Sequence, residues 1–115
     1  MAFDGTKLSD IIDIMDAYIT SIRPPEHIRP KLDFSYEIVD QSIILNEIRP
    51  QWSDPTKIIS SGYARATYVN TKEIWKIFWM RADLKWHTYK PNPQVDSLED
   101  FLAIVRKDEY GCFNG

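Results

Sequence analysis

Cysteine is the residue that this sequence has least of, because Cys112 is the only one in 115 residues. A single cysteine excludes a disulfide within the chain and any zinc site built on cysteine pairs, and it fits a reducing compartment. No apolar run approaches the roughly 20 residues that cross a bilayer, so we expect no membrane association. The first five residues lack the basic start and apolar stretch of a secretory signal, so we predict a cytoplasmic protein.

Internal repeats, low-complexity segments and long polar tracts are also missing, which argues against a solenoid or a disordered chain. The composition is 43% hydrophobic and 13% aromatic, against 27% charged residues, as is typical of a globular protein. At 115 residues such a chain can bury well over half of its unfolded surface without disulfides or metals. We therefore predict a single domain over residues 1–115.

The small net charge of −3 hides an uneven distribution along the chain. Residues 1–59 carry six basic and ten acidic side chains, residues 60–92 carry six and two, and residues 93–115 carry two and five. A basic middle between acidic flanks indicates either an anion-binding face or charge pairing within the fold.

The first expected element is a helix over residues 8–23. Its apolar residues recur at the three-and-four spacing of one helical face, and acidic residues occupy the opposite side. Thr6 or Ser9 is the expected N-cap, and Pro24 and Pro25 should end the helix.

From Leu32 the apolar period changes to two, which indicates strands. We predict strands over residues 32–38, 42–49, 63–69, 73–81 and 84–89, with a loop over residues 51–61. Links this short require antiparallel pairing, because parallel strands need crossovers of a dozen or more residues. The strand over residues 73–81 is apolar on both faces and should be central. Ser97 should cap a closing helix, so the predicted fold class is α+β: a five-stranded antiparallel meander sheet with an N-terminal and a C-terminal helix.

Three motifs carry a family resemblance. Residues 79–89 read W-x-R-x-D-L-K-W-H-x-Y, residues 111–115 read G-C-F-x-G, and residues 47–52 read E-x-R-P-x-W. In these motifs the chain resembles the bacterial domain-of-unknown-function 3024 family, from about residue 25 to the C-terminus. The resemblance implies no known activity, cofactor or catalytic residue.

A catalytic reading centres on Asp83, Lys85 and His87, which would share one face of a regular strand. Asp83 and Lys85 resemble the D-x-K half of metal-dependent nucleases, in which lysine polarises the attacking water beside a divalent ion. That chemistry needs a further carboxylate, for which Glu47 and Glu73 are the candidates. The alternative is that Asp83 caps a tight turn and His87 is an ordinary sheet residue. We favour this alternative and expect neither a metal, nor another cofactor, nor catalysis.

Two arginines, Arg49 and Arg81, offer a second choice. A guanidinium can hold a carboxylate or a phosphate by two hydrogen bonds, so either residue could bind an anionic ligand. We favour a structural ion-pair network, with Glu47 among its carboxylates.

Cations and aromatic residues alternate in the basic segment. Single-stranded nucleic acid binds such surfaces through base stacking and phosphate contacts, whereas in a small domain the same residues often form the core. The candidate binding residues are Arg49, Trp75, Trp79, Arg81, Lys85, Trp86, His87 and Tyr89.

The tail residues Cys112 and Phe113 are expected to anchor the C-terminus across the sheet, since nothing near Cys112 in sequence would activate its thiol. Taken together, these patterns predict a non-catalytic binding module whose partner is a protein or a second copy of the chain. Single-stranded nucleic-acid binding and metal-dependent hydrolase or nuclease activity are the two alternatives.

Overall fold

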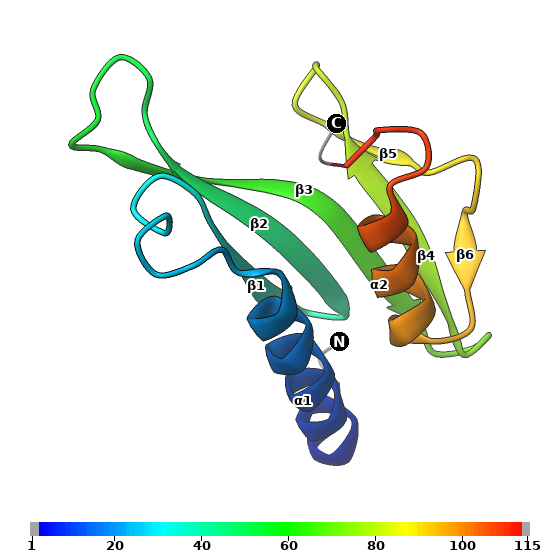
Figure 1. The fold of residues 1–115 in the computed structure, drawn as a ribbon. Coiled ribbons are helices and arrows are strands. Elements are labelled where there is room, and N and C mark those ends of the chain that lie inside the picture. Colours follow the sequence, from blue (N-terminus) through cyan, green and yellow to red (C-terminus); the bar gives the residue numbers. More distant parts are fainter. Residues whose placement is uncertain (1–2, 114–115) are drawn as a thin grey trace.

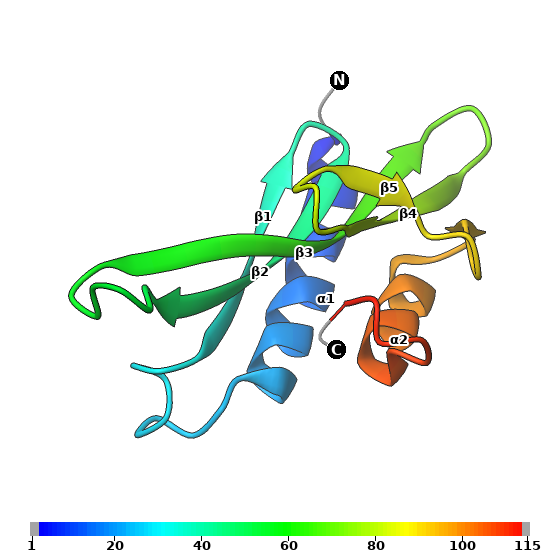
Figure 2. The ribbon, with the colours of Figure 1, turned by 90° about the horizontal axis from the view of Figure 1, so that it is seen from above.

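The computed structural model describes residues 3–113 and has two layers, an antiparallel sheet and a pair of helices that both cover one face of it (Figures 1 and 2). The fold is α+β, as the sequence predicted. Its elements are α1 (Gly5–Ile22), β1 (Asp33–Val39), β2 (Ser42–Pro50), β3 (Ile58–Val69), β4 (Ile74–Met80), β5 (Trp86–Thr88), β6 (Gln94–Val95) and α2 (Leu98–Lys107).

The strands form an antiparallel meander in the order β1-β2-β3-β4-β5, which confirms the predicted topology. A sixth strand, β6, was not expected, because two residues after a proline-rich linker carry no periodic pattern. It pairs with the first half of β4, while β5 pairs with the second half. The outer edge of β4 is therefore shared by two short strands.

Helix α1 begins after Asp4, whose carboxylate accepts a hydrogen bond from the Lys7 amide at 2.9 Å. The expected caps, Thr6 and Ser9, are wrong, because both lie inside the helix. The apolar face buries Ile11 and Met15 against the sheet. No helix within residues 3–113 is both long and apolar enough to cross a membrane.

Two polar contacts tie α1 to β1. The Arg23 guanidinium donates to both carboxylate oxygens of Asp33, at 2.8 and 2.6 Å. The Tyr36 hydroxyl donates to the Asp16 carboxylate at 2.7 Å, and burial together with that hydrogen bond raises the pKa of Tyr36 to about 12. These contacts fix the first strand beneath the first helix.

Helix α2 begins where the sequence predicted, because the Ser97 hydroxyl accepts a hydrogen bond from the Asp100 amide at 3.1 Å. The helix ends at Lys107, and the capping residue Asp108 that follows adopts the left-handed conformation with φ 43°. Its buried face contains Leu98, Phe101, Leu102 and Val105.

The core lies between the helices and the inner face of the sheet. Ile43 and Leu45 of β2 are fully buried there, and their partners across the strand pair, Ala66 and Ala64, are fully buried as well. Because alanine side chains are short, the helices can pack close to β3. Trp75 and Ile77 extend the same layer along β4.

Strand β3 is longer than predicted and begins at Ile58 instead of Tyr63. Residues 58–61 were expected to be loop, yet they pair with residues 47–50 of β2. Their sequence, Ile-Ile-Ser-Ser, has no alternation, and these positions are exposed on both faces of the ribbon, so no period-two signal arises. The two strands project beyond the helices as a two-stranded arm (Figures 1 and 2).

Strand β5 is shorter than predicted and begins at Trp86, because residues 81–85 form a turn. Asp83 accepts a hydrogen bond from the Lys85 amide at 3.0 Å, and Leu84 has a positive φ of 62°. The hydrogen bond from the Arg81 amide to the Lys85 carbonyl, at 3.2 Å, closes the turn. A regular strand through Asp83 is therefore the wrong expectation, and the tight turn is the right one.

The tail returns to the sheet after α2. Phe113 is buried, and its backbone amide donates to the Asp108 carboxylate at 3.0 Å. The predicted anchoring of the tail by Phe113 is thus confirmed, and Cys112 beside it is half-buried.

Candidate functional site

A cleft opens where the end of β4, the turn, β5 and the C-terminal tail meet. Its volume is about 450 Å³, and Trp79, Arg81, His87, Lys90 and Cys112 are among the residues that line it. Two of the sequence motifs, at residues 79–89 and 111–115, thus contribute to one cavity although more than twenty residues separate them. We call this cavity the basic cleft.

The β4–β5 pairing sets the geometry of the basic cleft. Trp79 lies directly opposite His87, so the two side chains share one face of the sheet. The Arg81 guanidinium lies over the Trp79 ring, 5.5 Å from its centroid. A guanidinium stacked on an indole can still donate hydrogen bonds through the N–H groups at its edge, which here lie at the rim of the basic cleft.

The catalytic candidates only partly come together. His87 Nε2 lies 2.8 Å from Asp83 Oδ2, and this hydrogen bond, with that of the Lys85 amide, lowers the pKa of Asp83 below its usual value. Asp83 therefore serves the turn and His87, while the Lys85 side chain is exposed. Glu47 is on β2, with β3 and β4 between it and β5, and it pairs with Arg49.

The candidate binding residues divide among the core and both faces of the sheet. Trp75 and Tyr89 are only 3% and 2% exposed, so they belong to the core and are withdrawn from the candidate surface. Trp86 lies on the face opposite Trp79, where its ring packs above Gly62 and Ile44. The helices decide this division, because they cover only one face of β4.

The arm carries three exposed large apolar side chains, and one of them is the most exposed such side chain among the described residues. Trp52 at its turn is 96% exposed, and Ile58 and Ile59 are 61% and 44% exposed. The turn is held by its own hydrogen bonds, including one from the Gln51 amide to the Lys57 carbonyl at 2.7 Å. Sequence reasoning missed this site, although two isoleucines and a tryptophan inside an expected loop were the available signal.

The ion pair between Arg49 and Glu47 lies at the base of the arm. This is the structural role that the sequence favoured for Arg49. Both residues also border the Trp52 side of the arm, in a shallow hollow that includes Ile59.

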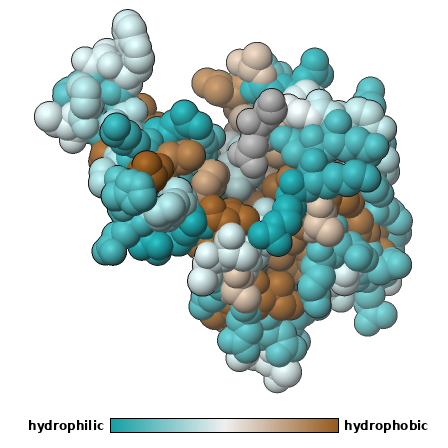
Figure 3. Space-filling view, in the orientation of Figure 1, coloured by the Kyte–Doolittle hydropathy of each residue, from teal (hydrophilic) through white to brown (hydrophobic). Residues whose placement is uncertain are grey.

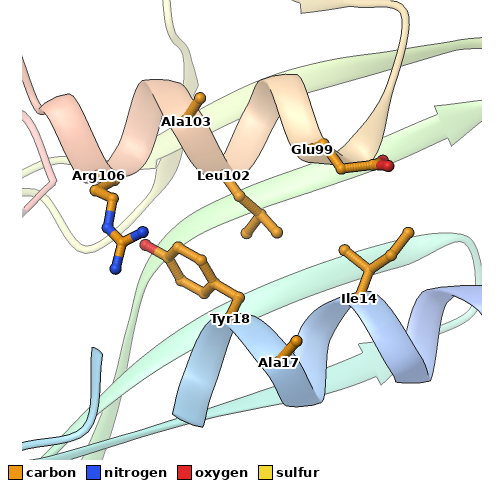
Figure 4. A pocket seen from close by; sticks show the side chains of 7 residues that line it. All are labelled: Ile14, Ala17, Tyr18, Glu99, Leu102, Ala103 and Arg106. Carbon is orange, nitrogen blue, oxygen red and sulfur yellow. The ribbon is translucent and has the colours of Figure 1, made fainter. Parts of the chain in front are cut away.

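An apolar groove separates the two helices, and Figure 4 shows its lining. Its volume is about 430 Å³. Hydrophobic surface is visible between the helices in Figure 3. We call this cavity the interhelix groove; it is lined by Ile14, Ala17 and Tyr18 of α1 and by Glu99, Leu102, Ala103 and Arg106 of α2.

Charged residues lie at both ends of the interhelix groove, on either side of its apolar floor. The Arg106 guanidinium donates to the Ser21 hydroxyl at 3.0 Å and lies 5.9 Å from the centroid of the Tyr18 ring. Burial raises the pKa of Tyr18, so this phenol is neutral at physiological pH. Glu99 lies at the other end, beside Ile14 (Figure 4).

Comparison with known proteins gives one match. No curated protein and no solved structure matches the chain at a significant level. A family model described as domain of unknown function (DUF3024) matches residues 3–115. This match covers nearly the whole chain, including the three motifs that carried the resemblance. The chain therefore belongs to the DUF3024 family.

Proposed function

We propose that this chain is a non-catalytic interaction module that binds a protein partner through its arm. The observation that carries the proposal is the exposure of Trp52, at 96%, on a turn ordered by its own hydrogen bonds. Tryptophan is the residue most enriched at interface hot spots, where truncation to alanine costs about 2 kcal/mol or more. An indole held in water on a rigid support is suited to entering a partner's pocket.

The flanking residues make the arm a contact element of useful size. Ile58 and Ile59 place apolar side chains on the same projection as Trp52, with Arg49 and Glu47 at its base. A protein interface typically has such a composition, with a few apolar anchors surrounded by polar residues.

A second copy of the chain is the partner that the described surfaces support best. The interhelix groove is apolar, and its volume of about 430 Å³ is large enough for an indole ring. The charges on the turn of the arm are complementary to those at the ends of the groove. Asp54 is opposite in charge to Arg106, and Lys57 is opposite in charge to Glu99. Each chain would insert its arm into the groove of the other, a reciprocal two-fold arrangement.

Sedimentation velocity over a range of concentrations tests the proposal. We expect the wild-type chain to dimerise and Trp52→Ala to weaken the dimer by about thirtyfold or more, which corresponds to about 2 kcal/mol. Leu84→Ala is the matched control, because Leu84 is 81% exposed on a different turn and should leave the dimer unchanged. Equal dimerisation of wild type and Trp52→Ala would refute the arm as the contact element.

Mixing two variants tests the groove separately. Ala103 lines the groove at an exposed position of α2, so Ala103→Glu places a carboxylate in the groove. Alanine and glutamate both favour helix, so the variant should keep α2 intact. At a concentration where the wild-type chain is dimeric, we expect Trp52→Ala alone and Ala103→Glu alone to be mostly monomeric. An equimolar mixture of the two should form more dimer, because the intact arm of one variant then meets the intact groove of the other. Normal dimerisation of Ala103→Glu would refute the groove but keep the arm. A wild-type chain that stays monomeric would refute self-association. In that case, a protein that the wild-type chain captures and Trp52→Ala does not would support a different protein partner for the arm.

The two alternatives have weaker support. A metal-dependent hydrolase needs a carboxylate cluster, and residues 3–113 contain no group of three histidine, cysteine or acidic side chains that could hold a metal ion. Single-stranded nucleic acid needs aromatic faces in a row with cations, whereas Trp75 is buried and Trp79 and Trp86 lie on opposite faces.

A further inference from the structure

The basic cleft holds more positive than negative charge. Arg81 and Lys90 both line it, and neither forms an ion pair with a described residue. The nearest acid on the turn, Asp83, is already engaged by His87 and by the Lys85 amide.

The acids of the tail do not change this balance inside the cleft. The Asp108 carboxylate, at the end of α2, accepts a hydrogen bond from the Phe113 amide. Glu109 borders a separate cavity beside Tyr110 and Lys107. Neither residue lines the basic cleft.

The positions of the two cations are set by rigid neighbours. Arg81 is held by its stacking on Trp79 and by the turn that its amide closes with Lys85. Lys90 follows Tyr89, whose ring is buried against Phe113 and whose amide donates to the Ile77 carbonyl at 2.9 Å. Their backbone positions are therefore fixed before any ligand arrives, which reduces the entropy cost of binding.

We propose that the basic cleft binds the phosphate group of a small phosphomonoester. A phosphomonoester carries about 1.5 to 2 negative charges at neutral pH, which matches Arg81 and Lys90 together. The guanidinium of Arg81 can donate to two phosphate oxygens at once, and Lys90 can donate to a third. The indole of Trp79 and the ring of Pro91 provide apolar walls for the organic part of the molecule.

The dimensions favour a small molecule over a polymer. The volume of about 450 Å³ falls in the usual range of small-molecule sites. A nucleic-acid strand would require further cations in line with the cleft. Lys76 is on the face of β4 opposite Trp79, which lies on the helix-covered face. Lys72 lies on the turn before β4, at the end of the strand away from the cleft. The phosphate site is independent of the arm and of the proposed function.

NMR titration of the full chain with phenyl phosphate tests this site. We expect saturable shifts of the Arg81 Nε–H and Trp79 indole N–H signals, and at least a tenfold loss of affinity in each of Arg81→Gln and Lys90→Gln. Lys72→Gln is the control, because it removes the same charge from an exposed position outside the cleft and should bind like wild type. The absence of saturable shifts, or an equal loss of affinity in Lys72→Gln, would overturn the proposal.

Two further titrations separate the ligand classes. Benzoate carries one charge on a similar ring, so we expect it to bind at least tenfold more weakly than phenyl phosphate. Equal binding of benzoate would make this a carboxylate site and overturn the assignment. A single-stranded oligonucleotide without a terminal phosphate should not compete with phenyl phosphate. If it does compete, and if Lys72→Gln weakens this competition, the surface binds nucleic acid instead.

Discussion

The ring of Phe113 packs on that of Tyr89, with ring centroids 4.9 Å apart and planes inclined by 42°. Tyr89 follows β5 and is 2% exposed, while Phe113 follows α2 and is 6% exposed. The pair therefore joins the tail to the end of the sheet and places Cys112 at the wall of the basic cleft. The tail is part of the tertiary structure.

We predict that Phe113→Ala destabilises the domain by about 3–5 kcal/mol, because it removes a buried aromatic ring and leaves a cavity against Tyr89. The urea midpoint of unfolding measures this loss. Tyr110→Ala is the control, since Tyr110 is in the same tail but 62% exposed, and its midpoint should match wild type. A wild-type midpoint for Phe113→Ala would mean that the tail contributes nothing to the fold.

We predict that Gly62→Val destabilises the domain by about 1–3 kcal/mol through overpacking. A Cβ at Gly62 would lie 3.1 Å from both Ile44 Cγ2 and Trp86 Cζ2, and valine adds two further methyl groups there. Ser60→Val is the control, because Ser60 is exposed on the same strand and valine favours strands. If both variants unfold at the same urea concentration, Trp86 does not pack above Gly62.

The sequence predicted the elements that carry their own local signal. The alternation from Leu32 onward revealed the meander, Pro24 and Pro25 marked the end of α1, and Ser97 marked the start of α2. The start of β3 at Ile58 carries no such signal, because strand pairing alone orders the arm and no core packs on it. Its exposed side chains are the very residues that our proposed function uses.

The candidate site was predicted less well, because its geometry depends on contacts between distant segments. The sequence placed Asp83 and His87 on one face of a regular strand. In the structure Asp83 lies in a turn, with Leu84 at positive φ, and this turn brings its carboxylate to the His87 ring. The burial of Trp75 follows from the helices above it. Cys112 and Trp79 line the same cleft because of the path of the tail, which no local pattern encodes.

A third prediction concerns the start of α1. Asp4→Ala should cost about 0.5–2 kcal/mol, because the Asp4 carboxylate accepts the Lys7 amide at the N-cap. Ser9→Ala should change stability by less than about 0.5 kcal/mol, since Ser9 lies exposed inside the helix. Thermal unfolding of the two variants distinguishes the positions. A larger loss with Ser9→Ala would place the cap at the residue that the sequence first suggested.

A fourth prediction follows from the ion pair between Arg23 and Asp33. The hydrogen bond from Arg23 lowers the pKa of Asp33 in the folded state, so the folded chain holds this proton less tightly than the unfolded chain. The resulting stability is present above the unfolded pKa, about 3.9, and is lost as pH falls through the lower folded pKa. Asp33→Asn should therefore lower the urea midpoint at neutral pH, and the difference from wild type should shrink in acid.

The control for this pH dependence is Asp13→Asn on the exposed face of α1. It should leave the midpoint close to wild type at neutral pH, because Asp13 forms no ion pair with a described residue. A constant difference between Asp33→Asn and wild type at every pH would show that the ion pair contributes nothing and that the substitution acts through packing.

The last prediction is that magnesium, manganese and zinc ions do not raise the thermal unfolding midpoint of the chain. A site that binds only the folded state would raise the midpoint by mass action, and a metal-dependent nuclease must contain one. Asp83 is the acid nearest His87, but its two oxygens already accept the Lys85 amide and the His87 ring, and Glu47 is separated from it by two strands. Thermal scans with each metal ion, repeated on Asp83→Ala and on the exposed-site control Asp10→Ala, provide the measurement. A rise of several degrees that Asp83→Ala removes and Asp10→Ala retains would overturn the non-catalytic proposal and place a metal ion at the turn between β4 and β5.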